Sequence, residues 1–328
     1  MKILVLSELE MKNIMSMNDA IVAVKDAASS YSCGKTDIPL RTNIDVREHN
    51  GNSLYMYGYV PNSDALGIKI VSVFPDNQKI GLPVCPATMI IQNAKTGEIS
   101  ALLDGTYLTR LRTGALSGAA TDLLSRKDSK VFALIGTGGQ AECQLEGVLA
   151  VRDIEEVRVY SRNYENVLNF IEKVKIDKKQ KFIACKTSDE AINDADIITA
   201  VTVSNDAVFD GKKVKRGCHI NGVGSYTPFM SEIDEYIVCN ADIIIVDTLD
   251  GTINETGDFL KPMKKGIFKK EFITGELGEL VDNKCKWRMS SEEITFFETT
   301  GSAVFDLVTG QKMIELAKKK NIGKSIEL

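Results

Sequence analysis

The hydrophobic and polar positions of the first hundred residues predict one helix followed by several strands. Ser16 precedes a helical stretch from Met17 to about Ser32, with Asp19 in the first turn, where the helix dipole favours negative charge. Stretches of strand texture follow, separated by turn residues. They run from Arg41 to Val46, Ser53 to Val60, Leu66 to Phe74, Ala87 to Asn93 and Glu98 to Leu103. This part of the chain therefore predicts an antiparallel sheet with a helix.

The pattern changes in the second part of the chain. A long helix rich in small residues is predicted from Thr106 to about Ser125, and after Lys130 short apolar strands alternate with helical stretches. Continuous apolar strands between helices are typical of a doubly wound parallel sheet. The predicted strands run from Val131 to Ile135, Glu156 to Tyr160, Ile183 to Cys185, Ile197 to Val201, His219 to Val223 and Ile243 to Val246.

The fold class expected from this order is α/β, with a Rossmann-type domain and a separate α+β domain. The chain has 328 residues, of which 44% are hydrophobic, enough for two cores. We expect residues 1–125, completed by a C-terminal helix within 298–328, to form the α+β domain. Residues 126–297 are expected to form the doubly wound domain.

Composition excludes several classes of protein. The formal net charge of −5 argues against binding to a phosphate backbone, so no nucleic-acid partner is expected. No apolar run is as long as a membrane span, and the N-terminus does not read as a signal peptide, which predicts a cytoplasmic protein. The seven cysteines include no C-x-x-C pair, and the two histidines are far apart in sequence. Neither a metal site nor a disulfide framework is therefore expected.

A glycine-rich turn carries the first chemical signal. The strand from Val131 to Ile135 runs into Gly136-Thr137-Gly138-Gly139-Gln140-Ala141, which opens a helix that leads to a second strand. The glycines allow backbone to approach a pyrophosphate, and the helix N-terminus offers free N–H groups. The alternative is an ordinary strand–helix turn. The full strand–turn–helix–strand context favours a dinucleotide site.

The end of the second strand bears on the choice of cofactor. An NAD site usually has a carboxylate there for the ribose 2′-hydroxyl, whereas this strand ends in Tyr160-Ser161-Arg162-Asn163. Ser161 and Arg162 can bind a 2′-phosphate, which favours NADP(H) over NAD(H). Arg162 can equally be a solvated surface arginine. Thr113, Val201 and Val223 complete the residues assigned to the cofactor.

A lysine lies in the middle of an otherwise apolar strand. Lys69 shares one strand face with Val71 and Val73, and the other face is apolar as well. A buried ammonium must be paired or must face a ligand. The alternative is that the side chain reaches solvent at an edge. Sequence alone leaves both possibilities open.

Two arginines are further candidates for binding an anion. Arg112 lies on the long helix near Arg110, and periodicity does not decide which of the two points inward. Arg41 stands at the entrance of a strand. Guanidinium groups bind carboxylates through two parallel hydrogen bonds. Nothing in the spacing shows that these residues meet Lys69.

Along nearly its whole length the chain resembles the ornithine cyclodeaminase/μ-crystallin family. The matching stretches lie in order at Leu66-Gly67-Ile68-Lys69, Ala101-Leu102-Leu103-Asp104-Gly105 with Arg112-Thr113-Gly114-Ala115, Ile135 to Ala141, His219 to Gly224, and Glu255-Thr256-Gly257-Asp258.

The resemblance implies a homodimer with a Rossmann domain for NAD(P) and a separate domain for substrate binding and dimerisation. It also implies that Arg41, Lys69 and Arg112 hold the carboxylate of a small amino or imino acid. Family members include cyclodeaminases, amino-acid dehydrogenases and imine reductases, so membership indicates the chemistry better than the substrate.

The sequence departs from the cyclodeaminases of this family at one position. They have an acid/base aspartate shortly after the strand that here begins at His219, and in this chain Tyr226 stands there. A tyrosine, whose ordinary pKa is about 10, is a poor base but can donate a proton or a hydrogen bond. We therefore assign Lys69 and Tyr226 to the catalytic chemistry.

The leading hypothesis is an NAD(P)H-dependent oxidoreductase acting on the C–N bond of a small α-amino or α-imino acid, as an imine reductase or an amino-acid dehydrogenase. One alternative is ornithine cyclodeaminase, a lyase that recycles NAD. Another is a protein that binds NADP(H) and a small ligand without turnover.

Overall fold

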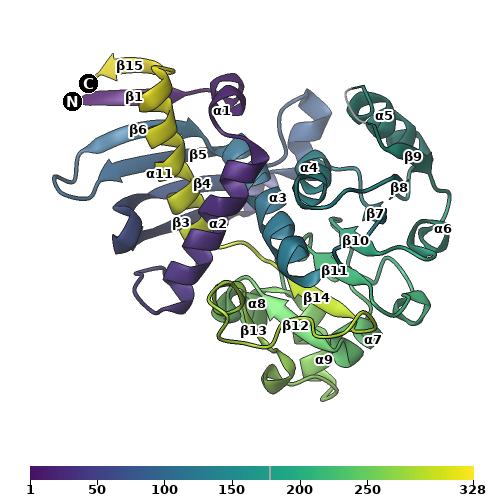
Figure 1. Ribbon diagram of the computed structural model, residues 1–328. Helices are drawn as coiled ribbons and strands as arrows, with labels where there is room; N and C mark the ends of the chain where they lie inside the picture. The colour runs from purple at the N-terminus through teal and green to yellow at the C-terminus, as the bar shows by residue number, and fades with distance from the viewer. Residues whose placement is uncertain (177–178) are drawn as a thin grey trace. The chain divides into compact units, whose positions relative to one another are not determined.

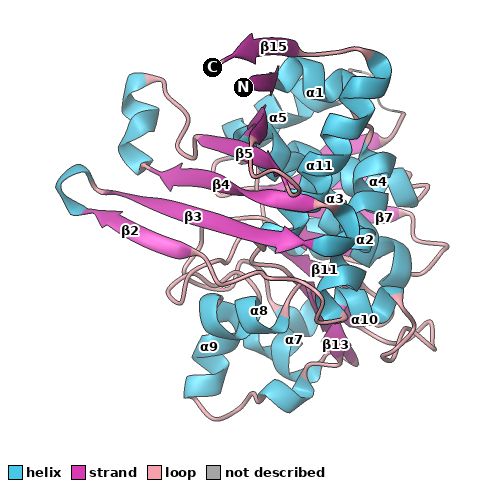
Figure 2. Ribbon diagram, turned by 90° about the vertical axis from the view of Figure 1, so that its left-hand side faces the viewer, coloured by secondary structure: helices cyan, strands magenta, loops and turns pink. Residues whose placement is uncertain are grey.

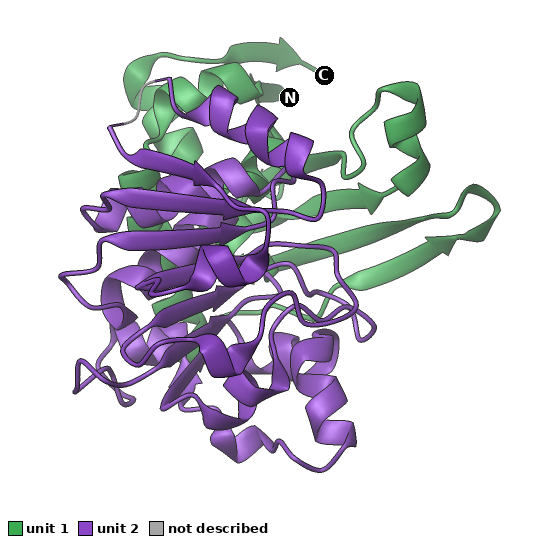
Figure 3. Ribbon diagram, turned by 90° about the vertical axis from the view of Figure 1, so that its right-hand side faces the viewer, with its two compact units in different colours: residues 1–112, 302–328 green, residues 113–301 purple. Residues whose placement is uncertain are grey.

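The computed structural model describes residues 1–176 and 179–328. The chain divides into two units, drawn in different colours in Figure 3. Unit 1 comprises Met1–Arg112 and Ser302–Leu328, and unit 2 comprises Thr113–Gly301. The division therefore falls between Arg112 and Thr113, inside the long helix that the sequence predicted from Thr106 to about Ser125.

Unit 1 contains a seven-stranded sheet in the order β15-β1-β6-β5-β4-β3-β2. Neighbouring strands are antiparallel except β1 and β6, which are parallel. The predicted antiparallel strands are confirmed, whereas β1 and β15 were not predicted. The strands are β1 (Lys2–Leu6), β2 (Thr42–Val46), β3 (Gly51–Val60), β4 (Ala65–Val73), β5 (Ala87–Asn93), β6 (Ile99–Asp104) and β15 (Lys324–Glu327).

Helices cover one face of this sheet, and α2 and α11 lie across it in Figure 1. The predicted helix from Met17 is confirmed, and Ser16 caps it: its hydroxyl accepts from the Asp19 N–H at 3.2 Å while Asp19 accepts from the Ser16 N–H at 3.1 Å. The longer helices are α1 (Glu8–Ile14), α2 (Met17–Ser32) and α11 (Ala303–Lys320), with α3 (Gly105–Leu124) beginning in this unit. Short 3₁₀ turns are η1 (Arg47–His49), η2 (Pro61–Ser63) and η3 (Pro75–Ile80).

The strands of this sheet alternate between a buried and a partly exposed face. On β3, Leu54, Met56 and Val60 are buried. The intervening Tyr55, Tyr57 and Tyr59 point to the opposite face, where Tyr57 is 42% exposed. Figure 2 shows β2, β3 and β4 side by side, with β2 at the edge of the sheet. This opposite face therefore leaves aromatic surface partly in water.

Unit 2 contains an eight-stranded sheet in the order β13-β12-β14-β11-β10-β7-β8-β9, with every neighbouring pair parallel. The fold class is α/β, with a doubly wound Rossmann unit and a separate α+β unit. The strands are β7 (Val131–Ile135), β8 (Glu156–Tyr160), β9 (Lys181–Ala184), β10 (Ile197–Ala200), β11 (His219–Gly222), β12 (Ile243–Val246), β13 (Gly275–Glu276) and β14 (Thr295–Glu298).

The connections of unit 2 are helical. The helices are α4 (Ala141–Val151), α5 (Tyr164–Val174), α6 (Ser188–Ile192), α7 (Glu235–Asn240), α8 (Leu249–Glu255), α9 (Gly257–Lys264) and α10 (Leu277–Val281), with the 3₁₀ turns η4 (Gly211–Lys213) and η5 (Lys270–Phe272). Over the described residues, no helix combines the length and the apolar character that crossing a membrane requires.

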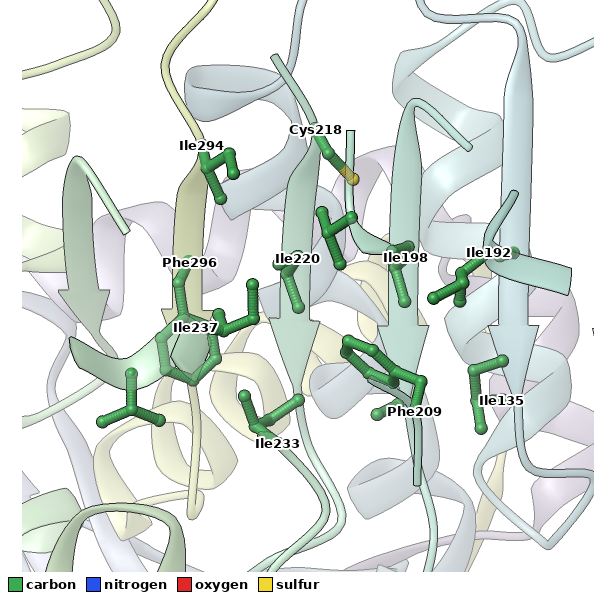
Figure 4. Close-up of a cluster of buried hydrophobic side chains, with 14 of the residues drawn as sticks. Ile135, Ile192, Ile198, Phe209, Cys218, Ile220, Ile233, Ile237, Ile294 and Phe296 are labelled. Carbon is green, nitrogen blue, oxygen red and sulfur yellow. The ribbon is translucent and has the colours of Figure 1, made fainter. Parts of the chain in front are cut away.

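The parallel sheet is buried on both faces, which explains its continuous apolar strands. Ile198 and Ile220 belong to one apolar cluster, shown in Figure 4, whereas the adjacent Ile197 belongs to a second cluster with Phe132 and Leu134. Two helices also approach closely in this unit: a Cβ on Gly147 of α4 would lie 2.1 Å from the Gly114 carbonyl oxygen of α3. Glycine is therefore required at that crossing.

Candidate active site

The turn after β7 has the backbone that its glycines predict. Gly136 has φ +112°, and its N–H donates to the Tyr160 carbonyl at 2.8 Å. A Cβ at this position would lie 2.5 Å from the Val201 carbonyl oxygen. Gly136 therefore cannot be replaced without moving the backbone, because both its conformation and its surroundings exclude a side chain.

Gly138 and Gly139 present the opposite situation. Both are exposed, and a Cβ on either would meet no heavy atom of the described residues within 4 Å. The helix α4 begins directly afterwards at Ala141, so its first N–H groups lie at this open turn. Gln140 Oε1 is buried, and no hydrogen-bond partner for it exists among the described residues. Open backbone at a helix N-terminus fits a dinucleotide pyrophosphate.

The end of β8 carries no carboxylate. Ser161 is half-buried and Arg162 is exposed. The next residue, Asn163, is committed to capping α5, because its side chain accepts from the Glu165 N–H at 3.0 Å. Ser161 and Arg162 are therefore the polar side chains at this strand end that remain suited to a ribose substituent.

A buried carboxylate holds together the loops that follow β10 and β11. Glu232 accepts from the Thr202 N–H at 2.6 Å and the Thr202 hydroxyl at 2.8 Å through one oxygen. Its other oxygen accepts from the N–H groups of Val223 at 2.9 Å and Gly224 at 2.5 Å. Burial, and then the charge of Asp258, raise the pKa of Glu232 to about 7, while these N–H groups oppose the rise.

Asp258 in turn holds the backbone on either side of Glu232. It accepts from the Ser231 hydroxyl and from the N–H groups of Glu232 and Ile233, each at 2.9 Å. Two buried carboxylates therefore fix the loops that carry Val201 and Val223: Glu232 binds the loops directly, and Asp258 holds Glu232. Both valines are 8% exposed. Tyr226 follows in the same loop and is half-buried, whereas Thr113 at the start of the unit is buried.

Unit 1 contains a buried cluster of charged side chains. Lys69 Nζ lies 2.7 Å from Asp306 Oδ2, and Arg112 Nε lies 2.9 Å from Asp306 Oδ1. The side chains are 1%, 5% and 0% exposed for the lysine, the arginine and the aspartate respectively. Lys69 therefore does not reach solvent, and the structure brings Lys69 and Arg112 together on one carboxylate.

The cluster carries more positive than negative charge, and this affects the pKa of Lys69. Burial is the largest cause that lowers the pKa of Lys69, to about 7, and the charges of Arg112 and Arg41 lower it further. The charge of Asp306 acts in the opposite direction. Arg41, whose charge also acts on the lysine, is half-buried and so less enclosed than Arg112.

One nitrogen of this cluster is available for an anion. Arg112 Nη1 is buried, and none of the described residues supplies a hydrogen-bond partner for it. By contrast, Arg110 on the same helix is 28% exposed on its side chain and pairs with Glu8 at 2.9 Å. The arginine that points inward is therefore Arg112.

A family model described as ornithine cyclodeaminase/mu-crystallin family matches residues 1–321. The chain belongs to this family. A Bacillus cereus relative named Δ(1)-pyrroline-2-carboxylate reductase is 36% identical over 324 residues, covering 99% of each chain.

Solved structures of family members are also similar to this chain over its whole length. Δ(1)-pyrroline-2-carboxylate reductase of Thermococcus litoralis, in complex with NADH and L-proline, superposes with a TM-score of 0.95 at 37% identity and covers 99% of this chain and 100% of that one. An archaeal alanine dehydrogenase dimer with bound NAD gives a TM-score of 0.92 at 33% identity, covering 100% of both chains.

Sequence reasoning missed two carboxylates in this family member. Asp306 is the single charged residue between Ala303 and Val308, and a lone acid inside an apolar helical run was an available signal. Glu232 had no such signal, because Ser231-Glu232 resembles an ordinary surface loop. Its role depends on N–H groups that are distant in sequence.

Proposed function

We propose that the protein is an NAD(P)H-dependent reductase of a small α-imino acid, with Δ(1)-pyrroline-2-carboxylate as the first substrate to test. The observation that carries the substrate class is the buried, positively charged cluster of unit 1, in which Arg112 Nη1 has no hydrogen-bond partner among the described residues. A carboxylate fits such a group, because charge-assisted hydrogen bonds are strong where water is scarce. The whole-length similarity to imino-acid reductases supports the reaction class.

In this proposal the two units have separate roles. Unit 2 holds the dinucleotide through Gly136, Gly138, Gly139, Gln140 and Ala141, with Thr113, Val201 and Val223 around the nicotinamide half. Unit 1 binds the substrate through Arg41, Lys69 and Arg112. When bound, the reduced nicotinamide supplies a hydride for the substrate α-carbon.

The protein side chains then supply orientation and a proton. Arg112 and Arg41 hold the substrate carboxylate, which fixes the adjacent C=N bond. Lys69 is the proposed proton donor to the imine nitrogen, because a group whose pKa is about 7 can both hold and release a proton near neutral pH. Tyr226 can donate a hydrogen bond but, unlike an aspartate, does not readily accept a proton. Imine reduction needs no group that repeatedly accepts protons, whereas cyclodeamination does.

The direct test is an assay of NADH and NADPH loss with Δ(1)-pyrroline-2-carboxylate, other cyclic imines, and keto acids with amines. We expect stoichiometric cofactor oxidation with formation of the amino acid. Ammonia release from ornithine without net cofactor change would identify a cyclodeaminase instead. Cofactor binding with no turnover on any of these compounds would leave only a binding protein.

The finer cofactor preference is a separate proposal. The two similar structures hold NADH and NAD, so a nicotinamide dinucleotide is the cofactor class. Ser161 and Arg162 at the end of β8 favour NADPH, because they offer a hydroxyl and a guanidinium to a 2′-phosphate.

Arg162→Asp is expected to weaken NADPH binding and to favour NADH in relative terms, since a carboxylate repels the phosphate and accepts from the 2′-hydroxyl. Titration of cofactor fluorescence measures both affinities. Lys175→Asp is the control: it makes the same charge change at the other end of α5, about 16 Å away along the helix. Wild-type protein that binds NADH at least tenfold more tightly than NADPH would contradict the assignment.

We also propose that the protein is a homodimer formed through the tyrosine-bearing face of the unit 1 sheet. Half-buried Tyr55, Tyr59 and Ile68 lie on this face with the exposed Tyr57. Contiguous apolar surface of this kind marks an interaction site. The similar alanine dehydrogenase is a dimer.

Tyr57→Glu is expected to shift the protein from dimer to monomer at micromolar concentration, because dimerisation would bury the new carboxylate without a partner. Light scattering after size exclusion gives the mass. The matched control is Leu9→Glu on α1, where a leucine that is 71% exposed lies outside this face. A Tyr57→Glu variant with the wild-type mass would remove the face from the interface.

A further inference from the structure

The helix α11 carries one carboxylate on a buried apolar face. Asp306 is 0% exposed, and its neighbours Val304, Phe305, Leu307 and Val308 are buried as well. An ionised carboxylate in such surroundings is costly unless cations and hydrogen bonds compensate it. The reason for retaining Asp306 must therefore lie in the groups that it contacts.

The two oxygens of Asp306 are divided between two different elements. Oδ2 binds Lys69 Nζ from β4 at 2.7 Å, and Oδ1 binds Arg112 Nε from α3 at 2.9 Å. One carboxylate thereby fixes the ammonium of a strand relative to the guanidinium of a helix. Because α11, β4 and this part of α3 all belong to unit 1, the arrangement is internal to one unit.

The binding mode of Arg112 determines what the arginine can still do. Asp306 occupies Nε, and Nη1 is left buried without a hydrogen-bond partner among the described residues. A guanidinium has a rigid planar fork of donors, so fixing Nε also fixes the direction of the remaining N–H groups. The structure therefore contains an oriented donor that a carboxylate of the protein holds in place.

We propose that Asp306 is a positioning residue for imino-acid reduction: it orients Arg112 towards the substrate carboxylate and keeps Lys69 in its charged, proton-donating form. This inference rests on the proposed function. In this proposal Asp306 acts through Lys69 and Arg112, whose N–H groups it accepts at its two oxygens.

The charges around Lys69 support the second half of the proposal. Asp306 from α11, Arg112 from α3 and Arg41 from the segment before β2 are the charged groups that act on it. Burial and both arginines lower the pKa of Lys69, whereas Asp306 raises it. Removal of the aspartate charge leaves only the lowering influences, so the lysine loses its proton at a lower pH.

A purely structural role for Asp306 makes a different prediction. If Asp306, Lys69 and Arg112 form only a structural ion cluster that takes no part in turnover, loss of the aspartate reduces the stability of the protein but leaves the pH dependence of turnover unchanged. The pH profile therefore distinguishes positioning from simple charge compensation, whereas a loss of activity at one pH does not.

The test is Asp306→Asn, an isosteric change, assayed with Δ(1)-pyrroline-2-carboxylate and NADH across pH 5.5 to 9. In the wild-type protein kcat/KM should fall as pH rises through about 7, because the Lys69 ammonium is then lost. In the variant we expect this limb to move at least about one pH unit lower, which alone lowers kcat/KM at pH 8 about tenfold. Loss of the orientation of Arg112 should bring the total fall at pH 8 to at least about 30-fold. NADH affinity should remain within about twofold of the wild-type value.

Glu8→Gln is the matched control, because it removes the carboxylate partner of Arg110 on the same helix, outside the site. It should keep the wild-type pH profile. If Asp306→Asn does not fold, Asp306→Glu keeps the charge but displaces it by one methylene, and kcat/KM should fall at least about tenfold with unchanged NADH affinity. The inference would be overturned if the Asp306 variant that folds, Asp306→Asn or Asp306→Glu, kept the kcat/KM and the pH profile of the wild-type protein.

Failure of the proposed function can be told apart from failure of this inference. Absence of imine reduction by the wild-type protein counts against the proposed function. Calorimetric binding of L-proline to the NADH-bound protein then tests the inference, because a carboxylate ligand should bind at least about tenfold more weakly to Asp306→Asn than to wild type at pH 8. Equal affinities would overturn it.

Discussion

Replacement of Lys69 or Arg112 by methionine is expected to reduce kcat/KM for the imino acid by roughly 10²- to 10³-fold, equivalent to about 3–4 kcal/mol of transition-state stabilisation. Both side chains are buried on Asp306, and the methionine keeps much of the apolar stem. In either variant the other cation still pairs with the aspartate, so folding should survive. Steady-state kinetics with each purified variant measure the loss, and NADH titration should give a nearly unchanged affinity.

The matched control for Arg112→Met is Arg110→Met, two residues earlier on α3. Arg110 pairs with Glu8 at the partly exposed edge of the unit, and its loss should leave kcat/KM within about twofold of the wild-type value. If Lys69→Met and Arg112→Met retained full kcat/KM on a substrate that the wild-type protein turns over, the cluster would be structural. Only the cofactor half of the proposal would then remain.

Substitution of Gly138 by valine is expected to weaken NADH binding at least about 100-fold while leaving the melting temperature within a few degrees of wild type. A Cβ here would meet no heavy atom of the described residues within 4 Å, so we expect the fold to accommodate the substitution. The same side chain fills the space through which a pyrophosphate approaches the backbone N–H groups. Fluorescence titration and thermal unfolding measure the two quantities separately.

A glycine elsewhere in unit 2 provides the contrast. In Gly147→Ala the new Cβ would lie 2.1 Å from the Gly114 carbonyl, so this variant should lose stability first. Tight NADH binding by a folded Gly138→Val protein would mean that the turn after β7 does not hold the dinucleotide.

Local sequence signals predicted much of the fold because their causes are local. The run from Val131 to Ile135 is both a continuous apolar segment and the strand β7, and Ser16 with Asp19 forms the cap that starts α2. The alternation around Lys69 likewise predicted a side chain on the same face as Val71. In each case the residues that determine the structure are neighbours in sequence.

The sequence could not reveal features that depend on distant partners. Lys324–Glu327 is mostly polar, and it forms a strand by pairing with β1, which is far away in sequence. Lys69 was open to two interpretations until its partner 237 residues away was known. Glu232 similarly gains its role from N–H groups of two loops that the parallel sheet brings together.

The connectivity of unit 1 also has a consequence for the order in which the protein matures during synthesis. Ser302–Leu328 supply α11 and β15, and Lys2 pairs with Glu327 in the finished sheet. Until residues 302–328 leave the ribosome, the earlier part of unit 1 lacks the helix that covers β3 and β4. Lys69 and Arg112 meanwhile have no carboxylate between them. Unit 2 is contiguous in sequence and contains all of its own strands, so it can complete its core first, and the two proposed halves of the active site then mature one after the other.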